Sequence, residues 1–350
     1  GERVNTQGSR RVKELVLADD YDGILAVARE QVEYGAHALD VCLALTERSD
    51  EDEQLAIVAK RLALAVPSPL MLDTLELPAL RRALEAYPGR ALINSINLEN
   101  GRERLDAVLP LAVEHGAAVV ALTIDEAGMA RTRSEKLRVA RRIVGICTEE
   151  YGLEPSDLVV DALTFTLATG EEEWRESAVE TIEGIRAIKA ALPGVLTSLG
   201  VSNVSFGLGK EARAVLNSVF LYHCVQAGLD MAIVNPADII PIADMSAEDR
   251  KLAEDLGNLR VKRAPRPGDS EAGARDGRAD RLRAGGRVRH ASGGRAPSCV
   301  REGVHPPGHQ AGQPDAGPGR DGQDPRHGAG PADDRPERQA DRGDGPGGDR

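Results

Sequence analysis

Aromatic residues are scarce in this sequence, and long apolar runs are missing. Phe, Trp and Tyr make up 3% of the 350 residues, so the core must be built mainly from Ala, Val, Leu and Ile. No apolar run approaches the roughly 20 residues that a membrane-spanning helix needs. The chain opens at Gly1 with polar and charged residues, unlike a signal peptide. We therefore expect a cytoplasmic protein with no membrane partner.

Cysteine is also rare, and positive charge is in deficit. The four cysteines are scattered with no C-x-x-C spacing, at Cys42, Cys147, Cys224 and Cys299. This excludes a disulfide framework and a zinc site of the usual spacing, and it indicates reduced, mostly buried thiols. The formal net charge of -12 argues against nucleic acid as a partner of the folded body.

Composition changes abruptly near Leu256. Beyond it Ile, Phe, Tyr, Trp, Met and Thr are absent, and Arg, Gly, Asp, Pro and Ala dominate. Such a segment buries too little apolar surface to offset its ordering entropy, so we predict a folded domain over 1–256 and a disordered tail over 257–350. The missing residue types are those of AT-rich codons. One hypothesis is therefore an out-of-frame translation of a GC-rich gene, and the alternative is a solvated linker or a weak polyanion-binding tail.

The segment 1–256 repeats a strand, a loop and a helix. The predicted strands are short apolar runs, typical of strands buried on both faces: Ala38–Cys42, Pro69–Leu72, Ala91–Asn94, Ala117–Ile124, Leu158–Val160, Val195–Leu199 and Met231–Val234. The predicted helices are Tyr21–Glu33, Asp52–Leu64, Leu77–Ala86, Arg102–Glu114, Arg133–Glu150, Trp174–Leu192, Glu211–Ala227 and Ala247–Leu256.

This alternation predicts an α/β fold with a parallel sheet and right-handed crossovers. Closed on itself, such a sheet is a TIM (β/α)8 barrel, which needs eight strands. The pattern supplies seven, and Gly1 to Arg3 look like the loop after a first strand. We therefore expect the first strand to be truncated.

Nearly every predicted strand ends in a carboxylate or a carboxamide. The residues are Asp40, Asp73, Asn94, Asp125, Asp161, Asn203 and Asn235. One such residue is explained by helix capping, but a ring of them at one mouth of a barrel is not. Carboxylates around a shared hollow repel one another, so the pattern indicates a ligand rich in N–H donors, such as a pterin, a guanine-like ring or a polyamine. A divalent metal is the competing explanation, disfavoured because no His lies among these strand ends.

The segment Leu199–Phe206 runs from a strand through a loop toward a helix. Gly200 lets a backbone approach a ligand closely, while Ser202 and Asn203 offer short hydrogen-bonding groups at the catalytic face of a barrel. The alternative is a turn that caps the next helix. Just beyond, Gly207–Lys210 is either an anion site at a helix N-terminus or a plain helix start.

Five motifs occur in order along the domain. They are GERVN at 1–5, MLDT at 71–74, INS at 93–95, LTIDEAG at 122–128 and GVSNVSF at 200–206, and two more follow, SVFLYH at 218–223 and AGLDMAIVN at 227–235. Together they resemble the pterin-binding domain family that carries methyltetrahydrofolate in cobalamin-dependent methionine synthase. That family is related to the corrinoid iron–sulfur protein methyltransferase and, more distantly, to dihydropteroate synthase.

The resemblance implies a barrel that binds 5-methyltetrahydrofolate across its C-terminal face. It implies transfer of the N5 methyl group to the Co(I) of a cobalamin carried by a separate domain or protein, as a half-reaction of methionine synthesis. The residues implied at the site are Glu2, Asn5, Asp40, Asp73, Asn94, Asp125, Asp161, Gly200, Ser202 and Asn203. Among them, Asp73, Asn94 and Asp161 would bind the N–H and amino groups of the pterin.

Methyl transfer requires positive charge on N5, because the methyl group of a neutral tertiary amine leaves poorly. Asn203 would accept a hydrogen bond from protonated N5, and water together with Asp161 or Asp125 would deliver the proton. We therefore name Asn203 and Asp161 as the catalytic candidates.

The sequence departs from the family pattern in the loop after Phe206. That loop is short and lacks an Arg that many members carry, so Lys210 or Arg213 would have to contact the folate tail. Two alternatives stay open: another pterin enzyme, of the dihydropteroate synthase type, and a non-functional truncated fragment with an open seam between strands.

Overall fold

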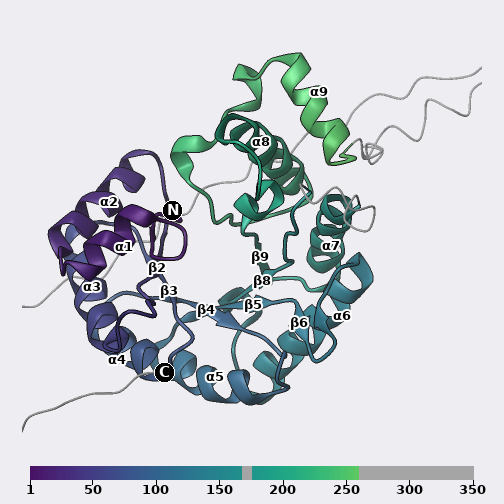
Figure 1. The fold of residues 1–350 in the computed structure, drawn as a ribbon. Helices are drawn as coiled ribbons and strands as arrows, with labels where there is room; N and C mark the ends of the chain where they lie inside the picture. The colour runs from purple at the N-terminus through teal and green to yellow at the C-terminus, as the bar shows by residue number, and fades with distance from the viewer. Residues whose placement is uncertain (168–175, 260–350) are drawn as a thin grey trace, which may run out of the picture. The chain divides into compact units, whose positions relative to one another are not determined.

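The computed structural model describes residues 1–167 and 176–259, which form a ring of parallel strands surrounded by helices (Figure 1). Seven strands pair in one parallel sheet, and neighbours in the sheet follow one another along the chain. They are β1 (Val4–Asn5), β2 (Leu39–Cys42), β3 (Leu70–Asp73), β4 (Leu92–Ile96), β5 (Ala118–Leu122), β8 (Leu158–Asp161) and β9 (Leu196–Ser198). The predicted parallel α/β architecture is confirmed.

Residues 231–234 close this ring between β9 and the start of β1. The Ile233 amide donates to the Leu199 carbonyl at 2.8 Å, and the Glu2 amide donates to the Val234 carbonyl at 3.1 Å. A parallel bridge joins Gly200 to Ile233. The predicted strand Met231–Val234 is therefore an isolated bridge and not a regular strand, but its hydrogen bonds join β9 to the start of β1, where the fragment alternative would leave an open seam.

The first strand is short, as expected. In β1, Val4 pairs with Val41 and Asn5 pairs with Cys42. Ahead of this ladder, the Asp40 amide donates to the Gly1 carbonyl at 3.0 Å. The start of the chain thus lies against β2 on one side and against residues 231–234 on the other, which brings Glu2 and Asn5 to the polar end of the barrel.

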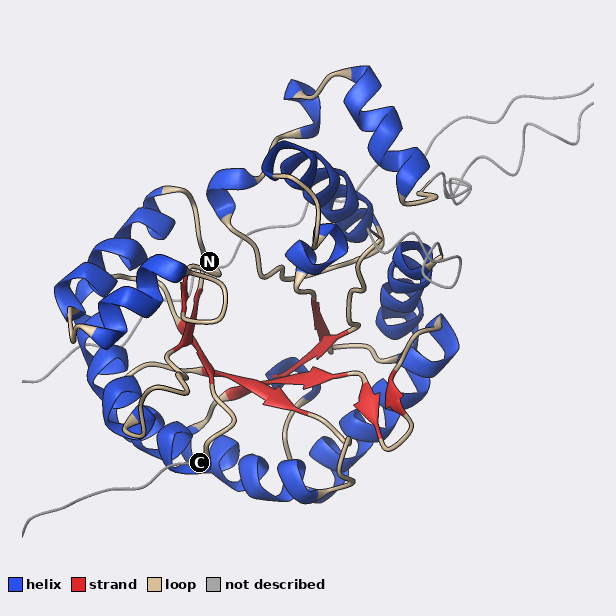
Figure 2. Cartoon of the chain, viewed as in Figure 1, coloured by secondary structure: helices blue, strands red, loops and turns tan. Residues whose placement is uncertain are grey.

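Helices cover the outside of the strands (Figure 2). They are α1 (Arg10–Leu17), α2 (Tyr21–Glu33), α3 (Glu51–Ala65), α4 (Leu77–Ala86), α5 (Glu103–His115), α6 (Arg133–Gly145), α7 (Ser177–Ala191) and α8 (Lys210–Gln226), while α9 (Ala247–Leu256) packs against α8. The bounds of α2, α4 and α9 are those predicted, and a π-helical turn over Ile146–Glu150 extends α6 to its predicted end. The first two residues of the predicted helix Trp174–Leu192, 174 and 175, lie outside the described residues.

Two elements depart from the sequence prediction. Helix α1 was not predicted, because it has eight residues and buries only Val12 and Val16. The predicted strand Ala117–Ile124 ends early, and its last residue belongs to a hairpin of β6 (Ile124–Asp125) and β7 (Gly128–Met129). A run of apolar residues hides such a break, since periodicity does not show where a chain turns.

The core is aliphatic, as the scarcity of aromatic residues predicts, with Leu39, Leu72 and Ile93 fully buried on successive strands. The thiols of Cys42, Cys147 and Cys224 are free and buried, as expected, while Cys299 lies outside the described residues. Among the described helices, none is both long and apolar enough to cross a membrane.

The described chain continues three residues past the predicted domain boundary at Leu256. Gly257 caps α9, and the Leu259 amide donates to the Glu254 carbonyl at 2.8 Å. Leu259 is itself buried in the core. The remainder of the tail predicted to be disordered, 260–350, lies outside the described residues.

Candidate functional site

Four predicted site residues meet on the first four strands, and we call them the amide–carboxylate cluster: Asn5 and Asp73 end β1 and β3, while Asp40 and Asn94 lie within β2 and β4. Asn5 Nδ2 donates to Asp40 Oδ2 at 2.9 Å and to Asp73 Oδ2 at 3.4 Å. Asn94 Nδ2 donates to Asp40 Oδ1 at 3.5 Å, and strand register places Asn94 beside Asp73. Parallel pairing therefore gathers residues that lie up to 89 positions apart, between Asn5 and Asn94.

Both carboxyls of the cluster hold protons more tightly than usual. Burial raises the pKa of Asp73 to about 7, and the nearby Asp40 carboxylate adds to the rise. Burial likewise raises the pKa of Asp40, against the effect of its two amide donors. Two buried carboxylates that share one amide repel each other, so a ligand that donates N–H groups to them stabilises their charged forms.

Asp161 ends β8 and is held by backbone groups. Its Oδ1 accepts from the Leu163 amide at 2.7 Å, and its main-chain carbonyl accepts from the Thr123 amide at 3.1 Å and from Thr123 Oγ1 at 3.0 Å. Burial raises the pKa of Asp161 to about 6, opposed by hydrogen bonds from the Leu163 and Gly200 amides and by the charge of Lys136. Asp161 is thus a preoriented acceptor.

The loop after β9 is a 3-10 helix over Val201–Ser205, between β9 and α8. Ser202 Oγ donates to both carboxylate oxygens of Glu2, at 3.0 and 3.1 Å. Asn203 is exposed, and a Cβ added at Gly200 would lie 3.0 Å from Asn203 Nδ2. The glycine therefore leaves room for the Asn203 side chain to fold back over the end of the strand.

Asp125 lies apart from the amide–carboxylate cluster in its bonding. Its Oδ2 accepts from Arg138 Nη1 at 2.6 Å, and its Oδ1 accepts from the Ala127 amide at 3.0 Å. The structure therefore groups Asp125 with the β6–β7 hairpin and α6. In the part of the chain that the structure describes, no three or more His, Cys, Asp or Glu residues are grouped so as to hold a metal ion.

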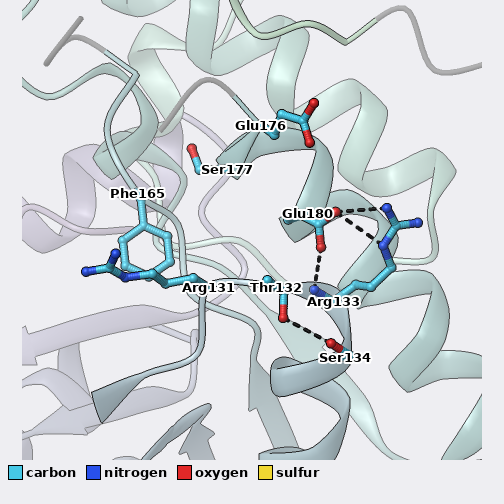
Figure 3. A pocket seen from close by; sticks show the side chains of 8 residues that line it. All are labelled: Arg131, Thr132, Arg133, Ser134, Phe165, Glu176, Ser177 and Glu180. Carbon is cyan, nitrogen blue, oxygen red and sulfur yellow. Dashed lines mark hydrogen bonds and ion pairs between the residues drawn. The ribbon is translucent and has the colours of Figure 1, made fainter. Parts of the chain in front are cut away.

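Described residues line two cavities, and neither is bordered by the whole set of acids and amides that the sequence predicts at the strand ends. One of about 490 Å³ takes in Asp40, Met71 and Ser198 from the barrel interior. The other, of about 410 Å³, lies between the starts of α6 and α7 (Figure 3), where Arg133 pairs with Glu180 at 2.8 Å. Of the predicted site residues, Asp40 lines the first of these two cavities.

Sequence reasoning missed two cations that hold the loops behind these acids. Arg104 donates to the carbonyls of Thr74 and Leu75, both at 2.8 Å. Lys136 is fully buried and donates to the carbonyl of Ala162 at 2.6 Å. A signal for the lysine was available, because Lys136 falls in register with the buried residues of its own helix.

The closed barrel with acids and amides at its strand ends belongs to a known class. Residues 1–235 match the family model described as "Pterin binding enzyme", and the chain belongs to this family. It is 47% identical over 259 residues to methionine synthase of Mycobacterium leprae (strain TN), covering 73% of this chain and 21% of that one. Methionine synthase of Mycobacterium tuberculosis (strain ATCC 25618 / H37Rv) is 46% identical over 259 residues, 73% of this chain and 22% of that one.

The chain thus spans about a fifth of the length of these curated relatives. Solved structures with a similar fold include a dihydropteroate synthase of Thermus thermophilus, with a TM-score of 0.47, 21% identity, and coverage of 68% of this chain and 87% of that one. A Yersinia pestis dihydropteroate synthase has a TM-score of 0.48, 15% identity, and coverage of 69% and 90%.

Proposed function

We propose that this chain binds 5-methyltetrahydrofolate at the carboxyl ends of its strands and transfers the N5 methyl group to the Co(I) of a cobalamin on a separate domain or protein. The observation that carries the proposal is the identity of 46–47% to two methionine synthases over 259 residues. The family match over 1–235 spans every residue of the amide–carboxylate cluster. The step is a half-reaction of methionine synthesis, in which Co(I) supplies the nucleophile.

The pterin is held, on this proposal, by acceptors on both sides of the barrel mouth. On one side, Asp73 and Asn94 accept hydrogen bonds from the N–H and amino groups. Asn5 and Asp40 hold these two side chains in place, since Asn5 donates to Asp73 and Asp40 accepts from Asn94. Asp161 accepts from the other side, since its carboxyl is already oriented by the Leu163 amide. Charge-assisted hydrogen bonds of this kind are about twice as strong as neutral ones, so they hold a flat, donor-rich ring firmly.

Asn203 acts at N5. The C–N bond breaks only when N5 keeps the electron pair without becoming an anion, so N5 must carry a proton. The carboxamide oxygen of Asn203 accepts the hydrogen bond of that protonated nitrogen, and its exposed position in the 3-10 helix after β9 leaves it free to rotate toward the ring. Glu2 and Ser202, bonded to each other, lie in the same part of the mouth. The proton reaches N5 from solvent through water, relayed by the Asp161 carboxylate, which is itself charged at rest.

The test separates binding from transfer. The folate is titrated into the chain by calorimetry, and methyl transfer to free Co(I) cobalamin is followed by the loss of the Co(I) absorbance. Asn203→Ala is expected to slow transfer by about 10² while changing the folate Kd little. Asn100→Ala, in an exposed turn after β4, is the matched control and should leave both unchanged.

Equal losses of binding and transfer in Asn203→Ala would reduce Asn203 to a group that only positions the ring. A wild-type chain that melts cooperatively but does not bind the folate would refute the proposed function itself. A broad, non-cooperative melt would instead favour the alternative of a non-functional fragment.

The dihydropteroate synthase reaction is the other pterin reaction that must be distinguished from the proposed methyl transfer. It handles a pterin pyrophosphate and needs cations that are available to an anion. Arg104 is engaged with the carbonyls of Thr74 and Leu75, and Arg138 is paired with Asp125, so neither favours that substrate. In a competition experiment, preference for the pterin pyrophosphate over 5-methyltetrahydrofolate would replace our proposal.

We assign binding of the folate tail to Arg213, in the first turn of α8. Arg213 Nε donates to Ser205 Oγ at 3.3 Å, in the 3-10 helix that also carries Ser202 and Asn203. Its guanidinium keeps donors for the tail carboxylates. We also propose a cytoplasmic location, because the thiols of Cys42 and Cys224 are free.

A further inference from the structure

Lys136 is a fully buried lysine on α6, and its ammonium is saturated with backbone acceptors. Nζ donates to the carbonyls of Ala130 at 3.0 Å, Ala162 at 2.6 Å and Leu163 at 3.3 Å. An ammonium has three N–H donors, and all three are used. Ala130 follows β7, whereas Ala162 and Leu163 follow β8. A single side chain therefore ties together two loops at the mouth of the barrel.

The surrounding elements are shaped to admit this side chain. A Cβ added at Gly184 of α7 would lie 2.7 Å from Lys136 Cδ, so the glycine supplies the space that the lysine stem occupies. The ring of Phe165 lies 5.1 Å from Nζ. Burial lowers the pKa of Lys136 to about 8, so the ammonium is charged at neutral pH. Burying a charge is costly without such partners, which indicates a specific use for this one.

That use is the turn after β8. Leu163 has a φ of 59°, a left-handed conformation that costs a non-glycine residue energy. The strained turn is held from three directions: the Leu163 amide donates to Asp161 Oδ1 at 2.7 Å, Thr181 Oγ1 donates to the Leu163 carbonyl at 3.0 Å, and Lys136 binds the Ala162 and Leu163 carbonyls. Of these three, Lys136 is the one that brings a positive charge.

We propose that Lys136 is a positioning residue for Asp161, which holds the strained turn so that the Asp161 carboxylate stays charged and aimed at the pterin. The inference deepens the proposed function and rests on it for its binding test. The charged groups facing Lys136 are Asp161, Glu180 and Glu135, and Lys136 is the cation that acts on Asp161. Loss of the ammonium removes the attraction that favours the ionised carboxyl.

The experiment uses Lys136→Met, which keeps the length of the stem and removes the charge. Folate binding is measured by calorimetry between pH 5 and pH 8. We expect affinity at pH 7 to fall on the order of tenfold, and the pH at which half of the binding is lost to move upward, because Asp161 then holds its proton to higher pH. A lysine that only stabilised the fold would leave this midpoint in place.

Lys189→Met is the matched control. Lys189 also bridges a helix to backbone, since its Nζ donates to the Val195 carbonyl at 3.0 Å and to Asp230 at 2.8 Å, but it does so at the opposite end of the strands. Its loss should leave the pH midpoint of folate binding unchanged. Asp161→Asn should remove the part of the pH dependence that Lys136→Met shifts.

Hydrogen exchange gives a readout that needs no folate. The Leu163 amide, bonded to Asp161 Oδ1, should exchange at least about tenfold faster in Lys136→Met than in the wild type, whereas amides of α2 should not change. If Lys136→Met does not fold, Gly184→Ala displaces the lysine stem without removing its charge, and the same Leu163 amide should exchange severalfold faster. Unchanged Leu163 exchange in a folded variant overturns the positioning role. Absence of folate binding by the wild type overturns the proposed function instead.

Discussion

The two sides of the barrel mouth hold their carboxylates in opposite ways. In the amide–carboxylate cluster, Asp40 and Asp73 are neighbours that share the amide of Asn5, and each raises the cost of ionising the other. Across the mouth, Asp161 accepts from backbone amides and feels the charge of Lys136. Burial raises the pKa on both sides, to about 7 for Asp73 and about 6 for Asp161.

The difference shows that neighbours, and not burial alone, set the charge of a buried acid. A like charge near Asp73 adds to desolvation, while a cation and N–H donors near Asp161 oppose it. On the proposed function, Asp161 is therefore the fixed acceptor, and the cluster adapts its proton content to the ligand. Replacing residues on one side at a time separates the two roles.

The largest effect is expected from Asp161→Asn. The amide cannot be charged, and it keeps one acceptor oxygen in place of two, so it cannot accept from the Leu163 amide and from the pterin at the same time. Folate Kd should rise on the order of a hundredfold, by comparison with the loss of a charged hydrogen bond. Calorimetric titration measures it, and a folded variant with wild-type affinity would remove Asp161 from the site.

Asp40→Asn should have a smaller effect on folate affinity and should clearly lower the pKa of its neighbour Asp73. Without the Asp40 charge, the pKa of Asp73 should fall below its present value of about 7, and folate affinity at pH 7 should change by about tenfold or less. Carboxyl NMR titration reports the pKa of Asp73 directly. An unshifted Asp73 would show that desolvation alone raises it.

Stability should depend on pH through the same acids. Because the pKa values of Asp73 and Asp161 are raised on folding, the folded chain binds more protons than the unfolded chain between about pH 4 and pH 7. The contribution of these acids to the free energy of unfolding therefore falls as pH rises through that window. Thermal melts at pH 5 and pH 7.5 should show a smaller difference in Asp73→Asn than in the wild type, and equal differences would contradict the assignment.

The smallest effect is expected from Arg104→Met. Arg104 holds the Thr74 and Leu75 carbonyls behind Asp73, but it is only half buried, so water replaces part of what it supplies. Folate Kd should rise by about threefold, within the range of one net hydrogen bond. Arg82→Met, which removes a surface ion pair with Asp52, is the control, and an equal effect of both would deny Arg104 a local role.

Much of the site could be predicted because strand ends are visible in the sequence. Asp73, Asn94 and Asp161 each follow an apolar run, and the parallel sheet brings the first two side by side. Asp125 was predicted to lie with them for the same reason. A hairpin begins there instead, and the Asp125 carboxylate accepts a hydrogen bond from Arg138. Periodicity locates the end of a strand and is silent on where the next residues turn.

The sequence by itself determined the alternation of strand and helix, and with it the end of each strand at which an acid or amide lies, because apolar periodicity is a local property. Only the tertiary structure decided that Asn5 stands between two carboxylates and that Lys136 points inward to the turn after Asp161. Those contacts join residues of different strands and helices, and they exist only once the barrel has closed and α7 has left space at Gly184.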